Sequence, residues 1–161
     1  MTSKLVGQDM LAAFEGVNGK WGYVNNKNEI IIKPYHKDCF PFHNGHAKVG
    51  KNKFLKANGV FLQVPFKMIE VREFSDSLAA VYVKGRWGYL DVKGKMKIPN
   101  KYNLCTDFNE GFAIARLGKK VFVIDKEGNE MEILASNTSV LLFRKFSGGL
   151  APIQVKNQEA W

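Results

Sequence analysis

Short runs rich in apolar residues recur along this chain, and polar residues typical of tight turns separate them. Residues 78–84 and 87–91 are rich in aromatic and β-branched side chains, and Gly85 and Arg86 stand between them. Such runs are typical of β-strands, and so short a separation is typical of a hairpin. The pattern therefore predicts two antiparallel strands with a turn at Gly85-Arg86.

A third strand is predicted directly after this hairpin. Asp91 and Gly94 suit a tight turn, because aspartate starts turns and glycine accepts a positive φ. Residues 95–99 then alternate, so Met96 and Ile98 should face the core while the lysines between them face water. The segment after Pro99 shows no such period, and we expect it to be a connection.

The same pattern recurs along the chain. A short box that opens on Phe and closes on Ala occurs at residues 42–47, 74–79, 108–113 and 146–151. Trp21 follows Ala13 at the spacing that separates Trp87 from Ala79, which indicates a diverged first copy. The period is roughly 32 to 38 residues, within the range of repeat architectures.

These repeats predict an all-β fold: a tandem array of about four three-stranded antiparallel meanders, propeller-like or a curved solenoid. One meander is too small to bury its own apolar face, so the copies must pack on one another in a single domain, 1–161. A helix over residues 5–14 is conceivable, but the alignment of Ala13 with Ala79 favours a strand. The expected repeats are 8–41, 42–73, 74–107, 108–145 and a partial copy at 146–161.

Residues at matching positions of the copies are expected to form the repeat core. Recurrence in register fits packing better than ligand binding, since a binding residue need not recur. The predicted core residues are Trp21, Tyr23, Phe42, Ala47, Phe74, Ala79, Trp87, Tyr89, Phe108, Ala113, Phe146 and Ala151.

The segments 19–24 (Gly-Lys-Trp-Gly-Tyr-Val) and 85–90 (Gly-Arg-Trp-Gly-Tyr-Leu), together with the Phe-to-Ala boxes, resemble the bacterial WG-repeat family, also called KWG repeats. The second and fourth copies have Asn52-Lys53 and Val121-Phe122 in place of Trp-Gly. The resemblance implies β-structured repeat modules that mediate interactions and share no catalytic residues. It also implies that the last copy is either truncated or pairs with the first to close a ring.

Composition narrows the class of protein. With 161 residues and 45% apolar content the chain can bury a moderate core. It contains no apolar run long enough to span a membrane and no secretory leader, so we expect a cytoplasmic protein that does not bind membranes. Two cysteines argue against a disulfide framework. Cys39 and Cys105 each precede a box Phe by three residues, which favours buried free thiols.

All three histidines lie near one cysteine. His36, Cys39, His43 and His46 have side chains that suit zinc. The repeat alignment, however, assigns Cys39 and His46 to packing positions, and convergence on one ion would distort the unit. We therefore predict no metal site and no cofactor, while metal binding by these four residues stays open.

The net charge of +9 invites a polyanion as partner. Residues 84–101 contain six basic residues and only Asp91 as an acid. A positive strip would use Arg86, Lys93, Lys95, Lys97 and Lys101, with Trp87 and Tyr89 available to stack bases. The alternative is that the lysines solubilise β edges. With only four arginines in the chain, bidentate phosphate contacts are less favoured.

No catalytic constellation is found. Asp76 and Glu110 hold the same box position, and Asp91 and Asp125 share another, so both pairs are interpreted as turn formers and not as an acid and a base. We expect no enzymatic activity.

Two functions remain as hypotheses. The first is a non-catalytic module that binds a protein partner through the loops that differ between copies, at 35–42, 67–74, 100–108 and 135–146. The alternative is a basic nucleic-acid or polyanion binder that uses the positive strip.

Overall fold

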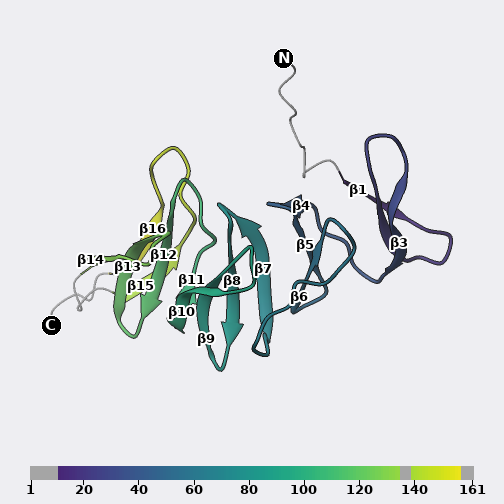
Figure 1. Ribbon diagram of the computed structural model, residues 1–161. Coiled ribbons are helices and arrows are strands. Elements are labelled where there is room, and N and C mark those ends of the chain that lie inside the picture. The colour runs from purple at the N-terminus through teal and green to yellow at the C-terminus, as the bar shows by residue number, and fades with distance from the viewer. Residues whose placement is uncertain (1–10, 135–138, 157–161) are drawn as a thin grey trace, which may run out of the picture. The chain divides into compact units, whose positions relative to one another are not determined.

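The structure is a computed structural model that describes residues 11–134 and 139–156. Within these residues the chain forms sixteen β-strands and no helix, and every paired strand is antiparallel (Figure 1). The all-β repeat fold predicted from the sequence is therefore confirmed. The strands are β1 (Ala12–Glu15), β2 (Trp21–Val24), β3 (Ile30–His36), β4 (Phe42–His43), β5 (His46–Val49), β6 (Lys53–Lys56), β7 (Glu70–Ser75), β8 (Leu78–Val83), β9 (Arg86–Asp91), β10 (Met96–Tyr102), β11 (Leu104–Cys105), β12 (Phe112–Leu117), β13 (Lys120–Asp125), β14 (Glu130–Leu134), β15 (Ser139–Phe143) and β16 (Ile153–Lys156).

The chain divides into two units, Met1–Gln63 and Val64–Trp161. The first unit contains two three-stranded sheets, β1–β2–β3 and β4–β5–β6. The second contains two four-stranded sheets, β7–β8–β9–β10 and β11–β12–β13–β14, followed by the two-stranded sheet β15–β16. Strands that are consecutive in the chain are neighbours in each sheet, so each sheet is a meander.

Four sheets have a first strand that the repeat pattern did not predict. β4, β7, β11 and β15 each precede the rest of their sheet, and β7 already contains the box residue Phe74. Phe74 pairs with Ala79 but Val71 pairs with Val81, so β7 carries one extra residue. This bulge breaks the two-residue alternation that reveals a strand in a sequence. The prediction of three strands per repeat is wrong for the sheets that contain β7 and β11, which have four strands each.

Two further boundaries differ from the prediction. The hairpin between β8 and β9 turns at Lys84 and Gly85, both with positive φ (48° and 82°), and not at Gly85-Arg86. Two such residues in succession match the right-handed twist of the strands that they connect. The third strand, β10, continues through Asn100 to Tyr102, where the sequence indicated a connection.

The continuation of β10 depends on an irregularity opposite Gly88. Tyr89 pairs with Ile98, and Trp87 pairs with Tyr102. One residue of β9 therefore faces three residues of β10, and the backbone of β10 folds in toward the glycine. A Cβ atom at Gly88 would lie 2.7 Å from the Asn100 backbone nitrogen, which is shorter than real Cβ contacts. Glycine is therefore required at this position.

The first unit repeats this arrangement. Tyr23 pairs with Ile32 and Trp21 with His36, so Gly22 also faces three residues. A Cβ atom at Gly22 would lie 2.5 Å from the Ile32 carbonyl oxygen. In both copies, glycine is required after tryptophan for the same reason. The strand that follows bulges toward this position and leaves no space for a Cβ atom.

The first copy also confirms the predicted strand over part of residues 5–14. β1 includes Ala13, while residues 1–10 lie outside the described residues. Ala13 pairs with Tyr23, whereas the residue that pairs with Tyr89 is Ala80 and not Ala79. The alignment of Ala13 with Ala79 was therefore wrong by one residue, because five residues separate Trp21 from its paired residue Glu15, whereas four separate Trp87 from its paired residue Tyr82.

Candidate functional site

Successive repeats within a unit are joined by a tyrosine and a phenylalanine. Tyr89 on β9 lies edge-on against Phe108 of the next box, with ring centroids 4.7 Å apart and planes at 74°. Its hydroxyl donates a 2.7 Å hydrogen bond to the Thr106 carbonyl oxygen, two residues before that phenylalanine. Tyr89 is fully buried, and burial raises its pKa well above the usual value for tyrosine.

The same junction occurs in the first unit. Tyr23 meets Phe42 edge-on, with centroids 4.8 Å apart and planes at 79°. Its hydroxyl donates to the Phe40 carbonyl oxygen, again two residues before the phenylalanine, over 3.0 Å. The tyrosine that follows Trp-Gly therefore closes the junction to the next copy, by edge-to-face packing and one hydrogen bond.

The box turns supply a second connection between copies. The central residues of each box turn have positive φ, as in Asp76 (51°) and Glu110 (55°). An Asp76 side-chain oxygen accepts a 2.8 Å hydrogen bond from the Gly111 amide of the next box. Glu110 accepts two, each of 2.7 Å, from the amides of Gly148 and Gly149. Each acidic residue therefore binds the turn of the following copy.

The family model described as a WG containing repeat matches the chain at residues 21–53 and 87–120. The chain belongs to the WG-repeat family. Each matched segment begins at a Trp-Gly pair and runs through the next Phe-to-Ala box, so it contains both the tyrosine and the phenylalanine of a junction. No curated protein matches the chain.

In this WG-repeat protein the last described junction departs from the two that Tyr23 and Tyr89 close. Val123 takes the place of Tyr89: it pairs with Ile114 and Met131 just as Tyr89 pairs with Ala80 and Ile98. Valine has neither the ring nor the hydroxyl of tyrosine. The box phenylalanine of the next copy, Phe146, is consequently left half-buried.

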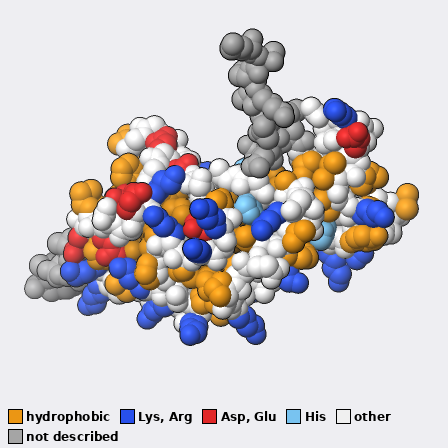
Figure 2. Space-filling view, viewed as in Figure 1, with side chains coloured by type: hydrophobic (Ala, Val, Ile, Leu, Met, Phe, Trp, Pro, Cys, Tyr) orange, Lys and Arg blue, Asp and Glu red, His pale blue; other side chains and the backbone are white. Residues whose placement is uncertain are grey.

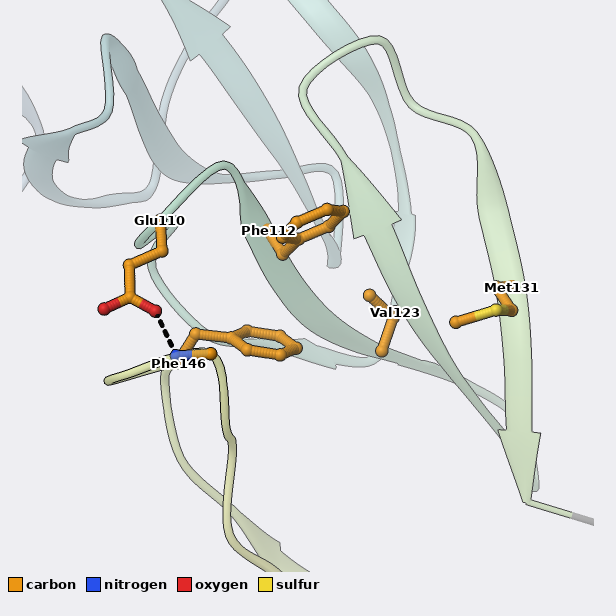
Figure 3. A pocket seen from close by; sticks show the side chains of 6 residues that line it. Glu110, Phe112, Val123, Met131 and Phe146 are labelled. Atoms are coloured by element: carbon orange, nitrogen blue, oxygen red, sulfur yellow. Dashed lines mark hydrogen bonds between the residues drawn. The ribbon is translucent and has the colours of Figure 1, made fainter.

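A pocket lies where the tyrosine ring is missing. It has a volume of about 280 Å³ and lies between the sheet β11–β14 and the box turn that connects β15 and β16. Figure 3 shows the side chains around it, with the Glu110 carboxylate hydrogen-bonded at its edge. The lining residues are Glu110, Phe112, Val123, Met131, Phe146 and Gly149.

The equivalent positions of the preceding junction form a closed core. Leu78, Tyr89, Ile98 and Phe108 are each at most 5% exposed and belong to one buried cluster. At the last junction the residues that match Leu78 and Ile98 are Phe112, which is 44% exposed, and Met131, which is 62% exposed. Phe112 contacts Phe146 at a centroid distance of 5.8 Å but does not close the space. The pocket is therefore an open version of the repeat junction.

The predicted core residues are mostly where the repeat pattern placed them. Trp21, Phe146 and Ala151 are only half-buried. Trp87 is 7% exposed and is covered by the guanidinium of Arg72, 4.6 Å from its ring. Trp87 therefore packs between repeats and offers no ring face for stacking. Those that are buried are Tyr23, Phe42, Ala47, Phe74, Ala79, Trp87, Tyr89, Phe108 and Ala113.

The structure brings together only part of the predicted positive strip. Lys93, Lys95 and Lys97 are exposed at the turn between β9 and β10 and on β10 itself. Arg86 lies at the other end of β9, about 17 Å away at the usual strand rise. Lys101 is 2.9 Å from the Glu130 carboxylate, which neutralises it. Lysine and arginine side chains are spread over the visible face in Figure 2.

The histidines and Cys39 take separate roles. His36 lies edge-on against Phe61, and a ring nitrogen of His46 lies 2.9 Å from the Asn44 carbonyl oxygen. Cys39 is half-buried where the sequence predicted full burial, whereas Cys105 is buried as predicted; both are free thiols. Among residues 11–134 and 139–156, no three His, Cys, Asp or Glu side chains form a group that could hold a metal ion.

The second pair of acidic residues also acts in turns. An Asp91 carboxylate oxygen accepts hydrogen bonds from the amides of Lys93 and Lys95. Asp125 does the same for Glu127 and Asn129. The interpretation of these aspartates as turn formers is confirmed.

The intervals assigned to variable loops contain strands. Residues 70–74 belong to β7, 100–102 to β10, 104–105 to β11 and 139–143 to β15. The loops available for binding are therefore shorter than the sequence indicated. Residues 135–138 of the fourth interval lie outside the described residues.

Sequence reasoning also missed the pocket. Its signal is present in the repeat alignment, where valine stands at the position of Tyr23 and Tyr89. The meaning of that valine becomes apparent only when tyrosine is seen to fill the junction to the next copy.

Proposed function

We propose that this WG-repeat protein is a non-catalytic interaction module that binds a protein partner. The supporting observation is the apolar surface at the last junction. Phe112, Met131 and Leu150 are 44%, 62% and 75% exposed, and the first two line the pocket while Leu150 follows its lining residue Gly149. Large exposed apolar side chains that gather around a concave site mark interaction surfaces.

This proposal moves the binding surface from the inter-repeat loops to the face of the sheet β11–β14. Polyanion binding through Lys93, Lys95 and Lys97 is the alternative. The described residues contain no helix that is long and apolar enough to span a membrane. The two free thiols suit a reducing compartment, so we place the interaction in a bacterial cytoplasm.

Site-specific photo-crosslinking in the native cell tests the proposal. A benzophenone amino acid replaces Met131 in one variant and Tyr35 in a control, because Tyr35 is 71% exposed but belongs to the other unit. We expect a specific protein to be cross-linked from position 131 and not from position 35.

Two results would contradict the proposal. One is a set of cross-linked proteins that is the same for both positions. The other is the capture of nucleic acid with an affinity that falls steeply with salt and is abolished by Lys95→Glu with Lys97→Glu, which would support polyanion binding.

A further inference from the structure

The backbone around the pocket keeps the form that receives a tyrosine at the preceding junction. There, the Thr106 amide donates to the Ile114 carbonyl oxygen, and the Thr106 carbonyl accepts the Tyr89 hydroxyl. At the last junction the Arg144 amide donates to the Pro152 carbonyl oxygen in the same relation to the box phenylalanine. The Arg144 carbonyl is therefore the equivalent acceptor for a phenol hydroxyl.

The rest of the receiving surface is also present. Phe146 corresponds to Phe108, whose ring is met edge-on by tyrosine. Glu110 holds the box turn of the last copy through two hydrogen bonds, which keeps Phe146 beside the sheet. The volume of about 280 Å³ exceeds the roughly 150 Å³ of an apolar cavity that stays dry and binds benzene.

We propose that this pocket binds the side chain of a tyrosine from a protein partner, in the place of the tyrosine that the fourth repeat lacks. The ring packs edge-on against Phe146 and beside Val123 and Met131, and its hydroxyl donates to the Arg144 carbonyl oxygen. The claim that the tyrosine comes from a protein partner rests on the proposed function. The occupant is inferred from Tyr23 and Tyr89, which fill the junction within the first unit and the preceding junction of the second unit.

The first test uses small phenols and the full chain. 4-Methylphenol reproduces the tyrosine side chain, and toluene is the same molecule without the hydroxyl. We expect 4-methylphenol to shift the NMR signals of Val123, Met131 and Phe146, and to bind about three- to tenfold more tightly than toluene because of one additional hydrogen bond. No shift at these residues would overturn the proposal.

The second test fills the pocket from within. Val123→Tyr supplies the missing ring, and Phe112→Leu with Val123→Tyr restores both residues of the third repeat in case the single variant is overpacked. We expect each to abolish 4-methylphenol binding and to raise the unfolding temperature. Val60→Tyr is the matched control, because it adds the same side chain at a position that is 54% exposed in the other unit. Unchanged binding by the filled variants would contradict the proposal.

The third test identifies the source of the ring. Blocked five-residue peptides with a central Tyr, Phe or Leu between glycines are titrated against the protein, and Tyr should bind most tightly. In the photo-crosslinking experiment, Val123→Tyr should remove the partner captured at position 131. A partner that still binds this variant would contradict the tyrosine proposal and leave the interaction module standing. If the protein self-associates and Val123→Tyr abolishes this association, the tyrosine comes from a second copy of this chain. That result would contradict the proposal of a separate partner.

Discussion

At the scale of single residues, the Trp-Gly-Tyr segment divides its roles between three neighbours. Trp87 packs beneath Arg72, Gly88 admits the bulged strand β10, and Tyr89 closes the junction to the next copy. A side chain at Gly88 has no space, because the atoms that it would meet belong to the backbone of Asn100 and Ile98. The motif is therefore a packing unit whose members cannot be exchanged independently.

The first prediction concerns this glycine. Gly88→Ala should lower the free energy of unfolding by about 1 to 3 kcal/mol or more, since the Cβ atom must displace backbone. Chemical denaturation of the purified protein measures the change. Gly118→Asn is the control: Gly118 has a positive φ of 61°, which asparagine tolerates, and nothing lies within 4 Å of its Cβ position. Equal losses in both variants would refute the role assigned to Gly88.

At the scale of elements, the last hairpin is held to the fourth sheet by its turn. Since Val123 supplies no hydroxyl, the described hydrogen bonds across this junction come from Glu110 and from Asn109, whose side-chain amide donates to the Phe146 carbonyl oxygen. A junction with few connections opens more readily than a closed core.

The second prediction follows from this attachment. Glu110→Ala should speed hydrogen exchange of the Gly148 and Gly149 amides by about tenfold or more, because both lose a charged acceptor. NMR-detected exchange measures each amide separately. Glu127→Ala removes a carboxylate from another exposed turn and should leave both amides unchanged. Equal protection in the two variants would show that the carboxylate does not hold the turn.

The strands themselves were predictable to different degrees. β8 and β9 follow directly from their aromatic and β-branched residues, and the exposed Lys97 with the buried Ile98 confirms the predicted faces of β10. β7 and the end of β10 were missed. In both strands a bulge interrupts the two-residue alternation of side chains. The alternation therefore cannot reveal the part of the strand that lies beyond the bulge.

At the scale of the whole molecule, buried hydroxyl and thiol groups link stability to alkaline pH. Burial raises the pKa of Tyr23, Tyr89 and Tyr102, and it raises the pKa of the Cys105 thiol from 9.0 to about 11. In the unfolded chain these groups ionise at their ordinary values. The folded state therefore retains more protons at high pH.

The third prediction is a loss of stability at alkaline pH. The free energy of unfolding should be nearly independent of these groups below about pH 8 and should fall from about pH 9 upward, as the unfolded thiol and tyrosines ionise first. Urea unfolding at a series of pH values measures the slope. Cys105→Ala should make the decline between pH 9 and pH 11 shallower, because the thiol contributes there together with the tyrosines. An unchanged slope in that variant would contradict the assignment to Cys105.

By itself the sequence determined that this protein is an all-β array of WG repeats, because recurring Trp-Gly-Tyr segments and Phe-to-Ala boxes record one packing solution used several times. It also determined that Asp91 and Asp125 form turns, since their hydrogen bonds are local. The carboxylates of Asp76 and Glu110, which the sequence assigned to turns in the same way, instead bind the turn of the next copy. Only the tertiary structure decided what the exceptions mean. A valine at a tyrosine position is an ordinary substitution within one repeat, and it becomes a pocket because the missing ring would have packed against residues of the next copy.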